Sequence, residues 1–158
     1  MPAAGAIESL PFVQALAQSP ALFAAVETVH TLGFVVLVGA VFFFDLRVLG
    51  LGKAIPVRAL ARLLLPWSCA ALAIIVPSGL ALFAVNADLL VDSRTFQLKM
   101  ALLVAALMNA GYFLTGPLAR AKAWDVDVPA PVGAKVSAIL SLFIWCAVIA
   151  CGRWLAYA

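Results

Sequence analysis

The sequence predicts an all-α fold, an integral membrane bundle of four helices running up and down, preceded by a short interfacial helix. Of its 158 residues, 66% are hydrophobic and only 11% are charged, and the mean hydropathy is +1.16. Soluble domains are about 45–50% apolar and about 25% charged. The composition therefore excludes an ordinary soluble enzyme, a disordered chain and a nucleic-acid-binding protein. The apolar runs are long and continuous, whereas barrel strands alternate, so helices are favoured over a β-barrel.

The first segment, from Ile7 to Gln18, is too short and too interrupted to cross a membrane. Its apolar residues recur at helical spacing, which predicts a short helix lying in the membrane interface. Ser19 and Pro20 then predict the start of the first span, because serine is a favoured N-cap and proline is favoured at the first helical position.

Four apolar segments are long enough to span a bilayer, and they cover residues 21–46, 59–83, 96–115 and 136–154. The second contains Pro77-Ser78-Gly79, which predicts a kink or a local opening of that helix. The connections are short, so consecutive helices are expected to be antiparallel neighbours. Residues 1–158 are therefore expected to form a single transmembrane domain.

Basic residues are distributed unevenly over the connections. The first and third connections with their flanks carry seven of them, namely Arg47, Lys53, Arg58, Arg62, Arg120, Lys122 and Lys135. The opposite side carries only Arg94, when Lys99 and Arg153 are set aside because they lie within the spans. Because basic residues are enriched on the cytoplasmic side of membrane proteins, both termini are predicted to be periplasmic, in a bacterial inner membrane. The lipid bilayer is thus the first expected partner, and no nucleic acid is expected.

Ionisable residues within spans are costly and are candidate functional groups by default. Four stand out, which are Glu27, His30, Lys99 and Arg153. With a rise of about 1.5 Å per residue, His30 lies roughly 15 Å inside the first span. Glu27 is one turn shallower and shares a helix face with His30. Lys99 and Arg153 lie near the outer ends of their spans, so all four are predicted at one level in the outer half of the membrane.

The residues leave their chemistry open. His30 could ligate a metal, or serve in a structural or proton-exchange role. It is the only histidine, so one chain cannot provide two imidazole ligands. Lys99 and Arg153 could extend to the interface, or could bind an anionic group such as the propionates of a haem.

Other polar residues in or near the spans have simpler interpretations. Asn109 and Tyr112 are predicted to hydrogen-bond between helices. Asp45 and Arg47 are expected to pair with each other or with loop groups. Cys69, Cys146 and Cys151 all fall within spans, where buried apolar packing is expected and a disulfide framework is not.

Three stretches carry a resemblance to small, mostly uncharacterised four-helix bacterial inner-membrane proteins. They are VETVHTLGFVVLVGAVFFFDLRVLG, FQLKMALLVAALMNAGYF and CGRWLAY, and the resemblance covers about residues 20–158. The histidine in span 1 and the K-M-x-L pattern in span 3 are more distantly similar to HemJ-type protoporphyrinogen oxidases and CopD-type membrane domains. The HemJ-type resemblance implies b-type haem, with His30 as axial ligand and Lys99 as its functional companion.

These observations lead us to expect a b-type haem-binding membrane protein with a redox or electron-transfer role, possessing haem-dependent oxidoreductase activity if it is an enzyme. His30 would ligate iron, Lys99 and Arg153 would bind propionates, and Glu27 would orient His30 or relay protons. A quinone or a periplasmic redox protein would be the partner. Two alternatives stay open: a transport module coupled to protons or metal ions, and a non-catalytic subunit of a homo-oligomer or larger membrane complex.

Overall fold

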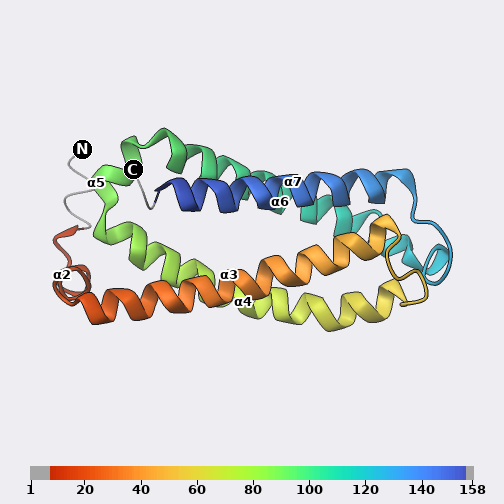
Figure 1. The fold of residues 1–158 in the computed structure, drawn as a ribbon, viewed down its shortest axis with the longest axis horizontal. Coiled ribbons are helices and arrows are strands. Elements are labelled where there is room, and N and C mark those ends of the chain that lie inside the picture. Colours follow the sequence, from red (N-terminus) through yellow and green to blue (C-terminus); the bar gives the residue numbers. More distant parts are fainter. Residues whose placement is uncertain (1–7, 156–158) are drawn as a thin grey trace.

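The computed structural model describes residues 8–155 and consists of helices joined by short connections (Figure 1). Four helices are long and apolar enough to cross a membrane: α3 (Pro20–Leu49), α4 (Val57–Val85), α6 (Arg94–Thr115) and α7 (Val132–Leu155). The predicted all-α membrane bundle is confirmed. Each observed helix extends one to four residues beyond the predicted span at one or both ends.

Shorter helices lie between and before the spans. They are α2 (Pro11–Gln18), α5 (Ala87–Asp92) and the 3-10 helix η1 (Leu118–Ala123). α2 forms the later part of the segment predicted as an interfacial helix, since it begins at Pro11, and Ile7 lies outside the described residues. Its buried residues, Val13 and Leu16, anchor it, since the helix packs against α3 and α4.

The first span begins as its sequence indicates. The Ser19 hydroxyl accepts a hydrogen bond from the Leu22 backbone N–H at 3.3 Å, and Pro20 occupies the first turn. At the other end Gly50 takes a left-handed conformation with φ of 115°, which closes the helix before the connection to α4.

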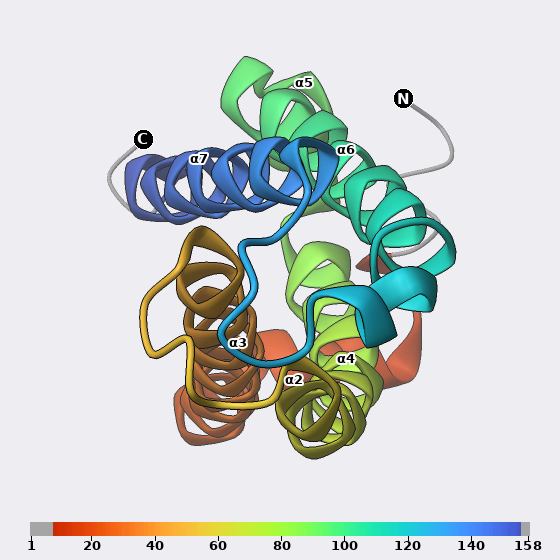
Figure 2. The ribbon, with the colours of Figure 1, turned by 90° about the vertical axis from the view of Figure 1, so that its right-hand side faces the viewer.

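The bundle is built from two hairpins (Figure 2). α3 packs along α4, α6 packs along α7, and α3 also contacts α7. Between α4 and α6 the rings of Phe83 and Phe96 stack, with their centroids 5.3 Å apart. Gly33 permits the close approach of α3 to α4, because a Cβ there would lie 3.0 Å from the Ile75 side chain. Large apolar side chains such as Phe43 and Phe143 are about 70% exposed, as expected of helices that face lipid.

The two ends of the bundle differ in chemistry. The connections α3–α4 and α6–α7 meet at one end, which we call the basic end because it carries the seven basic residues named above. Helix α5 and the outer ends of α3 and α7 lie at the opposite end, called the terminal end (Figure 1). Both ends of the described chain thus lie on one side of the bundle, as the predicted topology requires.

Candidate functional site

His30 of α3 contacts α4 at the Pro77-Ser78-Gly79 segment. Its Nδ1 lies 3.0 Å from the Ser78 hydroxyl oxygen. Pro77 lies inside the helix and has no backbone N–H to donate. The segment that predicts a local opening of α4 is therefore the one that receives the histidine.

The hydrogen bonds of Ser78 favour one tautomer of His30. The Ser78 hydroxyl is placed to donate to the Ile74 carbonyl at 2.6 Å, and its distance to the Ile75 carbonyl is 3.2 Å. With the hydroxyl proton on the α4 backbone, the neutral imidazole that pairs with Ser78 carries its proton on Nδ1 and donates it to the Ser78 oxygen. The Ile75 carbonyl is also within hydrogen-bonding reach of the ring. In the neutral imidazole, Nε2 then carries the lone pair, which is the arrangement that metal-ligating histidines adopt.

Gly79 fixes the position of the ring from the same side. A Cβ built on Gly79 would lie 2.9 Å from His30 Cε1 and 3.5 Å from Nδ1. A contact this short forces one of the two groups to shift, so any larger residue at position 79 would displace the imidazole from its place against α4. Ser78 therefore contacts the ring through a hydrogen bond, and Gly79 allows the ring to approach α4 closely.

Lys99 of α6 is a second ionisable residue at this end of the bundle, and the positive charge of its ammonium group acts on His30. Lys99 is half-buried, although it belongs to a helix whose residues are mostly exposed. His30 in the first half of α3 and Lys99 in the second turn of α6 therefore both belong to the terminal end.

Glu27 and Arg153 occupy the same end with exposed side chains. Both belong to membrane-spanning helices, Glu27 one turn before His30 and Arg153 in the last turn of α7. The contacts described here join His30 to Ser78 and Gly79, and Lys99 acts on His30 through its charge.

His30 is not surrounded by further candidate metal ligands within the described residues. Among residues 8–155, no three side chains of the His, Cys, Asp and Glu types lie together as a metal-binding group. Cys151 is a buried free thiol, as packing predicts. Cys69 and Cys146 are also free but exposed, so the expectation of burial is wrong for these two, since their faces of α4 and α7 are not covered by another helix.

A second polar group lies between helices nearer the basic end. Asn109 of α6 donates to the Ser137 carbonyl at 3.0 Å and accepts from the Ser137 hydroxyl at 2.8 Å. The predicted interhelical hydrogen bond is confirmed for Asn109. The Tyr112 side chain has a different setting, against Gly133 and beside a cavity at the basic end.

Asp45 and Arg47 are both buried, but the structure gives them different partners. Asp45 is 6% exposed and lies within hydrogen-bonding reach of Ser141 of α7, while its Oδ2 has no hydrogen-bond partner. Arg47 is 2% exposed and donates to the carbonyls of Ile55, Lys53 and Asp125 at 2.6, 3.0 and 3.0 Å. Of the two predicted options for Arg47, pairing with loop groups is the correct one.

Arg47 thereby ties the two connections of the basic end together. Asp125 completes the link, because its carboxylate accepts from the Arg58 N–H at 2.8 Å and its carbonyl accepts from the Val57 N–H at 3.0 Å. The sequence identifies Asp45 and Arg47 as polar residues, but it does not reveal that Arg47 and Asp125 join the two connections. It also presents Ser78 and Gly79 only as helix-breaking residues, although a hydroxyl in an apolar helix was a signal that a partner faced it.

The fold and this grouping define a multi-pass α-helical membrane protein with a single intramembrane histidine seated against a proline-containing helix. The chain belongs to a family of unknown function designated DUF6644, whose family model matches residues 17–158. No curated protein and no solved structure matches the chain. The match begins just before Ser19, so it includes every residue of the grouping around His30.

Proposed function

We propose that this membrane protein binds a b-type haem through His30 and serves in electron transfer or membrane redox chemistry. The observation that carries the proposal is the hydrogen bond from His30 Nδ1 to Ser78, which leaves Nε2 as the free coordinating nitrogen. A ligand histidine whose other nitrogen is held by a fixed acceptor is the usual arrangement at metal and haem sites.

The donor set fits a haem better than a bare metal ion. One imidazole is sufficient for a five-coordinate haem iron, whereas a structural metal site needs about four protein ligands, and no group of three candidate ligands occurs within residues 8–155.

Haem would supply the one-electron chemistry, and the residues of the chain would position and tune it. Ser78 and Gly79 hold the orientation of the imidazole. The Lys99 ammonium, and Arg153 closer to the membrane surface, are suited to the propionates. Glu27, on the same face of α3 as His30, would exchange protons with water.

Resemblance and topology support the same proposal. The distant similarity of the span-1 histidine and the span-3 K-M-x-L pattern to HemJ-type proteins implies haem at His30 with Lys99 as companion. With the basic end in the cytoplasm of a bacterium, the site lies near the periplasmic face of the inner membrane. A quinone in the bilayer or a periplasmic redox protein would exchange electrons there.

A second candidate function is proton-coupled transport, which the buried Asp45 specifically favours. A carboxyl group 6% exposed within a spanning helix, with one oxygen unpartnered, is typical of proton-handling sites. In that case His30 and Lys99 would act from the terminal end and Asp45 from nearer the basic end. Proton flux into vesicles, lost in Asp45→Asn but retained in Ser141→Ala, would favour this function.

Haem binding is tested by purifying the protein from haem-replete cells and measuring haem by the pyridine haemochrome assay. The wild type is expected to retain stoichiometric haem, and His30→Ala to lose it. Thr31→Ala is the matched control, because Thr31 is the exposed neighbour of His30 on the same helix. A colourless wild-type protein, or equal haem content in wild type and His30→Ala, would contradict the proposal.

A further inference from the structure

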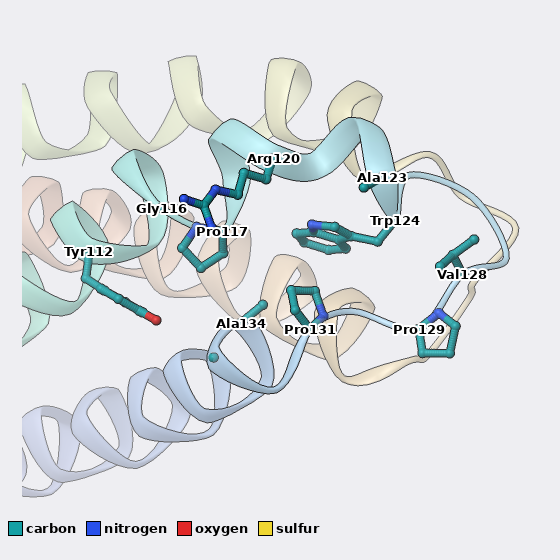
Figure 3. A pocket seen from close by; sticks show the side chains of 11 residues that line it. Tyr112, Gly116, Pro117, Arg120, Ala123, Trp124, Val128, Pro129, Pro131 and Ala134 are labelled. Atoms are coloured by element: carbon teal, nitrogen blue, oxygen red, sulfur yellow. The ribbon is translucent and has the colours of Figure 1, made fainter.

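A cavity of about 580 Å³ opens at the basic end of the bundle, remote from His30. It lies where α6 ends, and it is bordered by η1, the chain that follows it and the first turn of α7 (Figure 3). Prolines and small residues form most of its wall. None of the functional residues discussed above lines it.

Three polar side chains line the cavity, and each can donate a hydrogen bond. They are the hydroxyl of Tyr112, the guanidinium of Arg120 and the indole of Trp124. Figure 3 shows the Tyr112 hydroxyl directed toward α7 and the Arg120 side chain extending along Pro117. No aspartate or glutamate lines the cavity, so it presents donors and positive charge without a compensating carboxylate.

Trp124 provides an independent observation, because its indole N–H has no hydrogen-bond acceptor in the structure. Its side chain is 3% exposed, yet its Nε1 has no hydrogen-bond partner. Buried indole N–H groups usually have a hydrogen-bond partner, because burying an unpaired donor destabilises the folded chain. In Figure 3 this nitrogen lies on the edge of the ring toward Arg120, the cation that lines the cavity.

The position of the cavity along the bundle indicates which class of ligand it could bind. α6 ends at Thr115 and α7 begins at Val132, so the cavity lies where the spanning helices leave the apolar layer. The connection between α6 and α7 carries two basic and two acidic residues, and Lys135 follows in the first turn of α7. Of these charged side chains only that of Arg120 lines the cavity. Basic residues at this depth attract anionic lipid headgroups.

We propose that this cavity binds a phosphate ester carrying negative charge, with Arg120 pairing with the phosphate and Trp124 and Tyr112 donating to its oxygens. An anionic phospholipid headgroup and a soluble phosphate ester share this chemistry. The apolar proline wall would contact the glycerol portion of either one.

The proposal is tested by native mass spectrometry of the delipidated full-length protein. The probes are phosphatidylglycerol, phosphatidylcholine and soluble glycerol phosphate. Selective retention of phosphatidylglycerol assigns the lipid as the source, and binding of glycerol phosphate alone assigns a soluble ligand. Equal retention of the two lipids without glycerol phosphate binding would overturn the proposal.

Variants connect the binding to the cavity. Arg120→Gln should weaken binding about tenfold or more, because a charge-assisted hydrogen bond is lost. Lys122→Gln is the matched control, since Lys122 belongs to the same short helix but does not line the cavity. Unchanged binding in Arg120→Gln, or an equal loss in both variants, would overturn the assignment.

Trp124→Phe separates binding from folding. It removes the unpaired N–H and keeps most of the ring, so binding should fall several-fold while the thermal midpoint of the ligand-free protein stays the same or rises. Trp67→Phe, at an exposed position of α4, should change neither quantity. Undiminished phosphatidylglycerol and glycerol phosphate binding in Trp124→Phe would contradict the role of the indole.

Discussion

The imidazole of His30 lies so close to the Cα of Gly79 that a methyl group there would sit 2.9 Å from its Cε1. Gly79→Ala should therefore push the ring away from Ser78 and remove most of the bound haem. The measurement is the haem content of the purified variant by visible absorption.

Gly111→Ala is the control for the effect of alanine in a helix. A Cβ at Gly111 meets nothing within 4 Å, and alanine is favoured over glycine in helices by about 1 kcal/mol. This variant should keep its haem and its stability. Full haem content in Gly79→Ala would show that the contact does not position the ligand.

Ser78→Ala should weaken haem binding without abolishing it. Loss of the acceptor for Nδ1 leaves the ring free to rotate, and removal of such an orienting partner lowers affinity for the metal about 10–100-fold. Haem transfer to apomyoglobin measures the change. Ser68→Ala is closely matched, because Ser68 also donates to a carbonyl four residues earlier in α4; the account fails if both variants release haem at the same rate.

Lys99→Met should lower the midpoint potential of the haem. A nearby cation disfavours the more positive oxidised iron, so its removal favours oxidation, by on the order of 50 mV for a partly buried charge. Lys99→Arg keeps the charge and should stay near the wild-type potential. Spectroelectrochemical titration gives both values, and a potential that rises in Lys99→Met would oppose the assigned role.

The hydrogen bonds between Asn109 and Ser137 should contribute measurably to the packing of α6 on α7. Interhelical hydrogen bonds in membranes average about 0.6 kcal/mol, so Asn109→Ala should lower the free energy of unfolding by roughly that amount. A double-mutant cycle with Ser137→Ala, measured by denaturation in detergent, isolates the pair. Strictly additive effects of the two substitutions would show that the pair is not coupled.

Arg47→Met should destabilise the basic end strongly, because it leaves three loop carbonyls without their donor. The expected loss is about 3 kcal/mol or more, since hydrogen bonds to charged groups contribute about 1.5–3 kcal/mol each. Arg47→Lys should restore only part of the lost stability, because an ammonium group cannot donate to all three carbonyls as the planar guanidinium does. Arg62→Met, at an exposed position, controls for charge removal in thermal unfolding.

The spans and their order could be predicted because hydropathy alone determines which segments enter the bilayer. Boundaries were short by up to four residues at the ends, where polar residues such as Arg58 and Arg94 continue a helix into the interface. The sequence predicts only a connection where η1 forms, and the contact between Arg47 and the Asp125 carbonyl joins residues 78 positions apart. No local pattern reveals such a contact.

The candidate site could be predicted only in part for a similar reason. His30 and Lys99 stand out because charge and imidazole are rare in apolar helices. The contacts of Ser78 and Gly79 with His30 exist only when α4 packs against α3. From the sequence alone, both residues indicate only a break in the helix. Trp124 could not be recognised as an unpaired donor, since burial of an indole nitrogen is a property of the folded chain.

The central claim, that His30 Nε2 is the axial ligand of a haem, is tested most directly by chemical rescue. His30→Gly is purified and its reduced-minus-oxidised visible spectrum is recorded with and without added imidazole. We expect the wild type to show Soret and α bands, the variant to lack them, and free imidazole with haemin to restore them. A wild-type spectrum without these bands, or bands that persist in His30→Gly without imidazole, would contradict the claim.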